Sequence, residues 1–162
     1  MSGERILLTG IDPQAAAAFE QQLARLGYQV EGTVRTFTQV LALGRQACPQ
    51  LVLLDLHLPG LENLPTALAE LRSAWDTTLL LYLDVSESAV LTPDEVITRL
   101  DGFIYMQPED TYLDTILQAA LRRHAKDRQL HESNQRYRSL FEHNHDVVLI
   151  IAPASARIVE AN

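Results

Sequence analysis

An aspartate at the end of an apolar run is the residue best placed to do chemistry in this sequence. Residues 51–60 read LVLLDLHLPG, so that four aliphatic residues lead into Asp55 and the segment ends at Pro59 and Gly60. A continuous aliphatic run is typical of a strand buried on both faces, as in a parallel sheet with helices on either side. Open α/β folds place their chemistry outside the carboxyl ends of such strands. The position of Asp55 therefore predicts a nucleophile, a relic of one, or a residue that caps the following turn.

The elements that must position Asp55 alternate regularly along the chain. Five apolar runs are expected to be strands, at residues 6–9, 28–34, 51–56, 78–83 and 102–106. Helical patterns lie between and after them, at residues 12–27, 38–48, 65–75, 92–100 and from about 110 onward. This alternation predicts an α/β fold with a parallel sheet and right-handed crossovers. The economical arrangement is flavodoxin-like and doubly wound, with five parallel strands in the order 2-1-3-4-5.

Several helix ends are marked by their residue types. Asp12 is a good N-cap, Pro13 suits the first helical position, and Gly27 suits the end of the same helix. Thr92 and Glu95 form a capping box at the start of the helix predicted at residues 92–100.

The composition changes after residue 121. Residues 122–144 contain no proline or glycine and are strongly polar, which predicts that the last helix continues as a linker over residues 124–138. A possible coiled-coil seam follows spacings of four and three through Leu130, Asn134, Tyr137 and Phe141. An asparagine in that seam would favour two strands, and a solvated helix is the alternative. Residues 147–151 and 158–159 are expected to form a β-hairpin, which is too small to be a stable domain alone.

Composition and charge exclude some classes of protein. The chain has 162 residues, and 13 Lys+Arg against 21 Asp+Glu give a formal net charge of -8. Such a balance argues against nucleic-acid binding, which needs basic patches. Cys48 is the single cysteine, so a reducing compartment is expected. The amino terminus is neither a signal peptide nor a membrane span, and a cytoplasmic location is expected.

These residues resemble two known families. Residues 1–123, and most specifically LVLLDLHLPGLENL and GFIYMQPED, resemble the receiver domain of two-component response regulators. Residues 139–162, which end in VEAN, resemble the opening of a PAS sensory domain. The resemblance implies a receiver-like domain, a helical linker and a PAS fragment from a bacterial signalling protein.

The receiver resemblance also implies a set of site residues. In that family the strand-end aspartate accepts a phosphoryl group from a histidine kinase, and the reaction depends on positioning and charge stabilisation. Asp55 matches this phosphoacceptor, and the His57 backbone carbonyl matches one metal ligand. The family's two acidic metal ligands fall on Gly10 and Ile11, and its threonine or serine falls on Leu83. Its lysine falls on Met106, or on Gln107 if the following proline is aligned instead. Asp12 is at most a displaced ligand, and a cation such as Mg²⁺ prefers several carboxylate oxygens.

Four histidines could suggest a metal site outside the receiver machinery. They are His124, His131, His143 and His145. Their spacing does not pair two ligands on one helical turn, and no cysteine lies near them. We therefore expect exposed histidines on a helix.

The sequence thus predicts a degenerate receiver, or pseudo-receiver, that regulates PAS and output domains through protein contacts without normal phosphorylation of Asp55. The fragment is not expected to be an enzyme or to hold a cofactor; the missing output domain would be a diguanylate cyclase, a cyclic-di-GMP phosphodiesterase or a histidine kinase. The expected partners are its own PAS and output domains, a histidine kinase, and a second copy bound through the C-terminal helix. One alternative is a working phosphoacceptor with Mg²⁺ bound through Asp12 and Asp55. Another is a flavodoxin-like domain that binds a small ligand beside Ile11, Leu83 and Met106.

Overall fold

The computed structural model describes residues 3–10, 13–83, 100–105, 108–142, 149–152 and 157–161. The chain divides into two compact units, Met1–His124 and Ala125–Asn162.

The first unit is built on a five-stranded parallel sheet. Its strands are β1 (Arg5–Thr9), β2 (Gln29–Val34), β3 (Leu51–Asp55), β4 (Thr78–Leu83) and β5 (Gly102–Tyr105). They pair in the order β2-β1-β3-β4-β5, and every pairing is parallel. The predicted flavodoxin-like, doubly wound architecture is confirmed.

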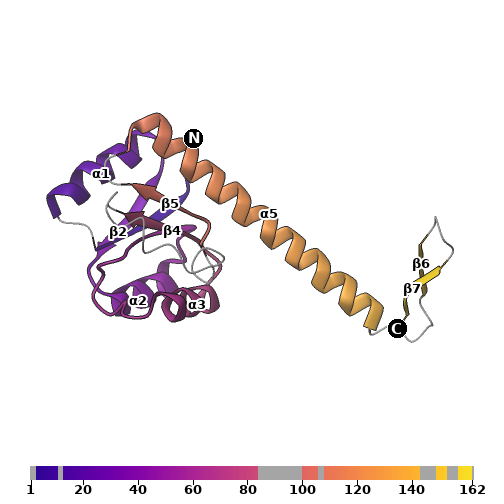
Figure 1. Cartoon of the computed structure of the whole chain (residues 1–162). Helices are drawn as coiled ribbons and strands as arrows, with labels where there is room; N and C mark the ends of the chain where they lie inside the picture. Colours follow the sequence, from indigo (N-terminus) through magenta and orange to yellow (C-terminus); the bar gives the residue numbers. More distant parts are fainter. Residues whose placement is uncertain are drawn as a thin grey trace. The chain divides into compact units, whose positions relative to one another are not determined.

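Helices cover both faces of this sheet (Figure 1). The described helices are α1 (Pro13–Arg25), α2 (Phe37–Ala47), α3 (Leu64–Ala74) and α5 (Asp110–Glu142). The helix predicted at residues 92–100, with Thr92 and Glu95, lies outside the described residues. Two helices begin slightly earlier than predicted because the residue before each is the N-cap: Thr36 accepts a hydrogen bond from the Gln39 N–H before α2, and Asn63 accepts one from the Thr66 N–H before α3.

Alternate residues of the strands feed two separate hydrophobic cores. In β3, Leu51 and Leu53 face the core beneath α1 and α5, whereas Val52 and Leu54 face the core beneath α2 and α3. The same alternation holds along β4, which is buried over its whole length. Since both faces are covered, the strands have the continuous aliphatic sequences seen in buried parallel sheets.

The ends of α1 bear out two of the three predicted signals. Pro13 is its first residue, where the missing proline N–H costs no hydrogen bond. Gly27 follows the helix with φ of 90°, a conformation that favours glycine. The predicted N-cap, Asp12, lies outside the described residues.

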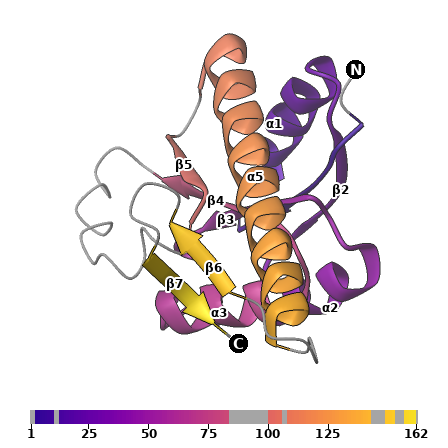
Figure 2. The same ribbon diagram turned by 90° about the vertical axis from the view of Figure 1, so that its right-hand side faces the viewer.

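In the second unit, α5 continues without a break to Glu142, which makes it 33 residues long. Beyond it, β6 (Leu149–Ala152) and β7 (Arg157–Ala161) pair antiparallel, as Figure 2 shows, so the predicted hairpin is confirmed. In the described part of the chain no helix combines the length and the apolar character needed to cross a membrane.

Candidate functional site

Asp55 is the last residue of β3, at the carboxyl edge of the sheet, and it is half-buried. Its backbone N–H donates a hydrogen bond to the hydroxyl of Thr9, 2.9 Å away, which is itself fully buried at the end of β1. One carboxylate oxygen, Oδ1, accepts a hydrogen bond of 2.8 Å from the backbone N–H of His57. An aspartate that bonds the backbone two residues ahead forms an Asx turn. The carboxylate therefore caps the loop that follows β3.

Gly10 lies directly against the side chain of Asp55. A Cβ atom on Gly10 would be 2.6 Å from the Asp55 Cβ and 2.7 Å from its Oδ2, and the φ of Gly10 is +67°. The Gly10 N–H donates a hydrogen bond of 2.9 Å to the carbonyl oxygen of Val34, which fixes this backbone. The place that the receiver resemblance gives to an acidic metal ligand thus has no room for a side chain.

The last residue of β4, Leu83, carries no hydroxyl group. Leu83, to which the receiver resemblance assigns the threonine or serine position, has 0% exposure and packs in the core beneath α2 and α3. An aliphatic side chain offers no hydrogen bond to a phosphoryl oxygen.

Of the other residues predicted to belong to the site, one is exposed and three lie outside the described residues. His57 is exposed, two residues beyond Asp55. Ile11, Asp12 and Met106 lie outside the described residues, so their roles stay predictions. Within the described ranges, no group of three His, Cys, Asp or Glu side chains is close enough to hold a metal ion.

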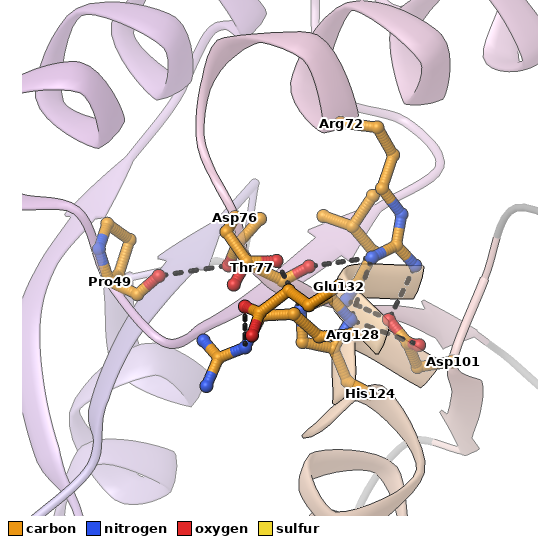
Figure 3. A network of polar contacts seen from close by, with 9 residues as sticks. Pro49, Arg72, Asp76, Thr77, Asp101, His124, Arg128 and Glu132 are labelled. Carbon is orange, nitrogen blue, oxygen red and sulfur yellow. Dashed lines mark hydrogen bonds and ion pairs between the residues drawn. The ribbon is translucent and has the colours of Figure 1, made fainter. Parts of the chain in front are cut away.

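A second polar group lies at the opposite, amino-terminal edge of the sheet, where β4 and β5 begin (Figure 3). It consists of Arg72 on α3, Asp76 after α3, Asp101 before β5 and His124 on α5, and we call it the amino-edge cluster. The expectation that His124 is an exposed helix residue is wrong: its side chain is only 16% exposed. The reason is that α5 still packs on the sheet at this turn, with Ala120 buried one turn earlier.

Asp101 holds the cluster together through both carboxylate oxygens. Its Oδ2 accepts hydrogen bonds from Arg72 Nη2 at 2.6 Å and from the Leu79 N–H at 2.8 Å. Its Oδ1 lies 3.6 Å from Nδ1 of His124. Burial alone would raise the pKa of Asp101, but the bonds with His124, Leu79 and Arg72 outweigh it and lower the pKa below its ordinary value.

His124 lies between two carboxylates. Its Nε2 is 2.8 Å from Oδ1 of Asp76, on the side away from Asp101. The bond with Asp101 raises the pKa of His124 above its ordinary value of 6.5, burial opposes this, and Asp76 adds to the rise. No local sequence pattern marks this cluster, because its members come from four separate segments.

Comparison with known proteins gives matches among solved structures only; no family model and no curated protein matches the sequence. A CheY-like receiver domain from Methylobacillus flagellatus is similar over 74% of this chain and 99% of its own, at 20% identity and a TM-score of 0.62. The receiver domain of a modulated diguanylate cyclase from Desulfovibrio desulfuricans is similar over 78% and 99%, at 18% identity and a TM-score of 0.63. A fusion that carries the yeast Spc42 trimeric coiled coil is similar over 85% and 87%, at 19% identity and a TM-score of 0.69.

These similarities define a class of fold. The first unit has the CheY-like receiver fold, with five parallel strands in the order that its sequence predicts, and a long C-terminal helix extends from it. At these identities the similarity concerns the fold, and function must be argued from the site.

Proposed function

We propose that this chain is a pseudo-receiver: a cytoplasmic receiver-like module that regulates PAS and output domains through protein contacts, without normal phosphorylation of Asp55. The observation that carries the proposal is the packing of Gly10 against Asp55. The receiver resemblance assigns Gly10 to the position of a metal-binding acid, and glycine has no side chain that could bind a metal ion.

The hydrogen bonds of Asp55 support the same proposal. A nucleophilic carboxylate must approach the phosphoryl group with its charge offset by a metal ion and a cation. Here Oδ1 accepts from the His57 backbone, and the fully buried Leu83 replaces a hydroxyl group at the end of β4. The aspartate is better suited to hold its loop than to take up a phosphoryl group.

The helix α5 is the route by which we expect the domain to act. Residues 125–139 are all exposed, and they include two large apolar side chains seven residues apart, Leu130 at 63% and Tyr137 at 41% exposure. That spacing suits the seam of a coiled coil, with Asn134 between them as the residue that sets register. The similarity to a fusion that carries a trimeric coiled coil supports oligomerisation through a helix but does not indicate the number of copies. We therefore propose that two copies pair through α5 and that the helix carries changes in packing to the PAS domain.

Phosphorylation is tested by incubating the chain with acetyl phosphate and Mg²⁺ and measuring its intact mass. We expect no stoichiometric phosphoryl adduct. An adduct on the wild-type chain that is missing from Asp55→Asn would refute the pseudo-receiver proposal. A working response-regulator receiver domain, treated in parallel, is the positive control.

Pairing is tested by sedimentation equilibrium. Leu130→Asn should weaken a dimer, whereas the neighbouring Gln129→Asn, off the seam, should leave it intact. Equal masses for the wild type and both variants would count against the seam.

Transmission through α5 is tested by insertions after Lys126 in the longer signalling protein. Inserting Gly-Gly should uncouple the output, whereas inserting Ala-Ala should alter the output while keeping the helix. Unchanged output with Gly-Gly would count against transmission through α5.

A further inference from the structure

The amino-edge cluster joins α5 to the rest of the first unit at the last turn of the helix within that unit. His124 is the final residue of Met1–His124, and α5 continues beyond it. The groups that face its imidazole come from three other segments: Arg72 from α3, Asp76 from the residues after α3, and Asp101 from the residue before β5. Through this one imidazole, α5 therefore contacts two carboxylates and one guanidinium group.

The imidazole has two hydrogen-bonding arrangements that depend on its protonation. When it is neutral with the proton on Nε2, it donates to Asp76, and Nδ1 can accept the hydrogen bond from Arg72 Nη1, 3.0 Å away. When it is protonated, Nδ1 also carries a hydrogen, so the contact with Arg72 becomes one between two donors. The new N–H must then turn toward Oδ1 of Asp101, at 3.6 Å.

Arg72 has other partners in either arrangement. Its Nη1 donates to the carbonyl oxygen of Thr77 at 2.9 Å, and its Nη2 is paired with Asp101. Loss of the imidazole contact therefore leaves the guanidinium bonded. The two arrangements therefore differ in the partner of His124 Nδ1, which is Arg72 of α3 when the ring is neutral and Asp101 when it is protonated.

We propose that the amino-edge cluster is a pH-responsive attachment of α5, in which protonated His124 is bound by Asp76 and Asp101 and neutral His124 is held less tightly. The proposal goes beyond the pseudo-receiver function and does not depend on it, because the cluster lies at the opposite edge of the sheet from Asp55. It gives the domain an input, the proton, that needs none of the phosphorylation machinery.

The direction of the response follows from the charges. The two carboxylates outweigh burial and raise the pKa of His124, while the pKa of Asp101 is lowered. The attachment is therefore at full strength below the unfolded histidine value of 6.5, as long as Asp101 stays ionised, and it weakens as pH rises through the raised pKa. Arg72 opposes the protonated form. The charged residues within four positions of His124 along α5 itself are Arg122, Arg123, Lys126, Asp127 and Arg128.

The titration is measured on the whole chain by NMR of the histidine ring signals, assigned with His124→Gln. We expect a midpoint above 6.5 for His124 that moves downward in Asp76→Asn, a mild change because the Asp76 side chain is half-exposed. His131→Gln removes an exposed histidine of the same helix and should leave the midpoint unchanged. A midpoint at or below 6.5, or one that Asp76→Asn does not lower, would overturn the proposal.

The attachment itself is measured by hydrogen exchange of the α5 amides around Ala120 and His124. Protection factors, corrected for the intrinsic rates, should be lower at about pH 8.5 than at about pH 5.5, by about tenfold for each pH unit that the midpoint lies above 6.5. They should be equal at the two pH values in His124→Gln. Equal protection in the wild type would show that His124 titrates without changing how α5 is held, and would overturn the proposal.

Discussion

Replacing Gly10 by alanine should destabilise the five-stranded unit, because the new methyl group has no space. The Cβ would lie 2.6 Å from the Cβ of Asp55 and 2.9 Å from its Cγ, distances that real Cβ contacts do not reach. Neither the Asp55 side chain nor the Gly10 backbone can move freely to make room. Asp55 is tied by hydrogen bonds to Thr9 and His57, and Gly10 is tied to Val34.

Two terms set the size of the effect. A left-handed backbone conformation costs a residue with a side chain roughly 1–2 kcal/mol relative to glycine. Forcing a methyl group into a filled space costs about 1–3 kcal/mol more. Together they predict a loss of about 2–5 kcal/mol, a large part of the roughly 5–15 kcal/mol that stabilises a typical domain. An aspartate at Gly10 would meet the same obstruction, so this single substitution should not create a metal site beside Asp55.

The loss is measured by urea unfolding followed by circular dichroism. Gly3→Ala is the matched control, because nothing lies within 4 Å of its Cβ position, and it should change the free energy of unfolding by less than about 0.5 kcal/mol. In an Asp55→Gly background, Gly10→Ala should cost only the backbone term of about 1–2 kcal/mol. A cost for Gly10→Ala no larger than that of the control would refute this account of the packing.

Three further predictions concern stability. Asp55→Ala should lower the free energy of unfolding by about 1 kcal/mol, since the His57 N–H loses its acceptor. Asp55→Asn keeps an acceptor oxygen and should cost less, and thermal unfolding compares the two variants. Gly44→Ala would place a methyl group inside the ring of Trp75 and should cost about 1–3 kcal/mol, whereas no measurable loss would show that the ring moves away freely. Because the pKa of His124 is raised, the free energy of unfolding should decline as pH rises above 6.5. Urea unfolding over a pH series should show a flatter decline for His124→Gln. Equal slopes of the free energy against pH in the wild type and the variant would contradict the raised pKa of His124.

The sheet could be predicted from the sequence because its signals are local. An aliphatic run such as residues 51–54 is long enough to identify a strand buried on both faces, and the regular alternation with helices leaves few topologies. The left-handed conformation of Gly27 also followed from its place after an amphipathic helix.

The contacts of the two polar sites could not be predicted in the same way. Thr9 bonds the backbone of a residue 46 positions away, and His124 meets Asp76 across 48 positions. The sequence around His124 is basic and polar, which is typical of an exposed helix face, and only the packing of α5 reveals that this turn is still partly covered. The resemblance to receiver domains leads one to expect an acid at Gly10, but the close approach of Gly10 to Asp55 depends on how β1 and β3 lie side by side.

The most direct test of the pseudo-receiver proposal is a titration with beryllium fluoride and Mg²⁺, which together mimic a phosphorylated aspartate. The amide signals of Gly10, Asp55 and His57 are followed by NMR in the isotope-labelled chain. The proposal predicts no saturable shift of these signals. Saturable shifts that require Mg²⁺ and vanish in Asp55→Asn would contradict it.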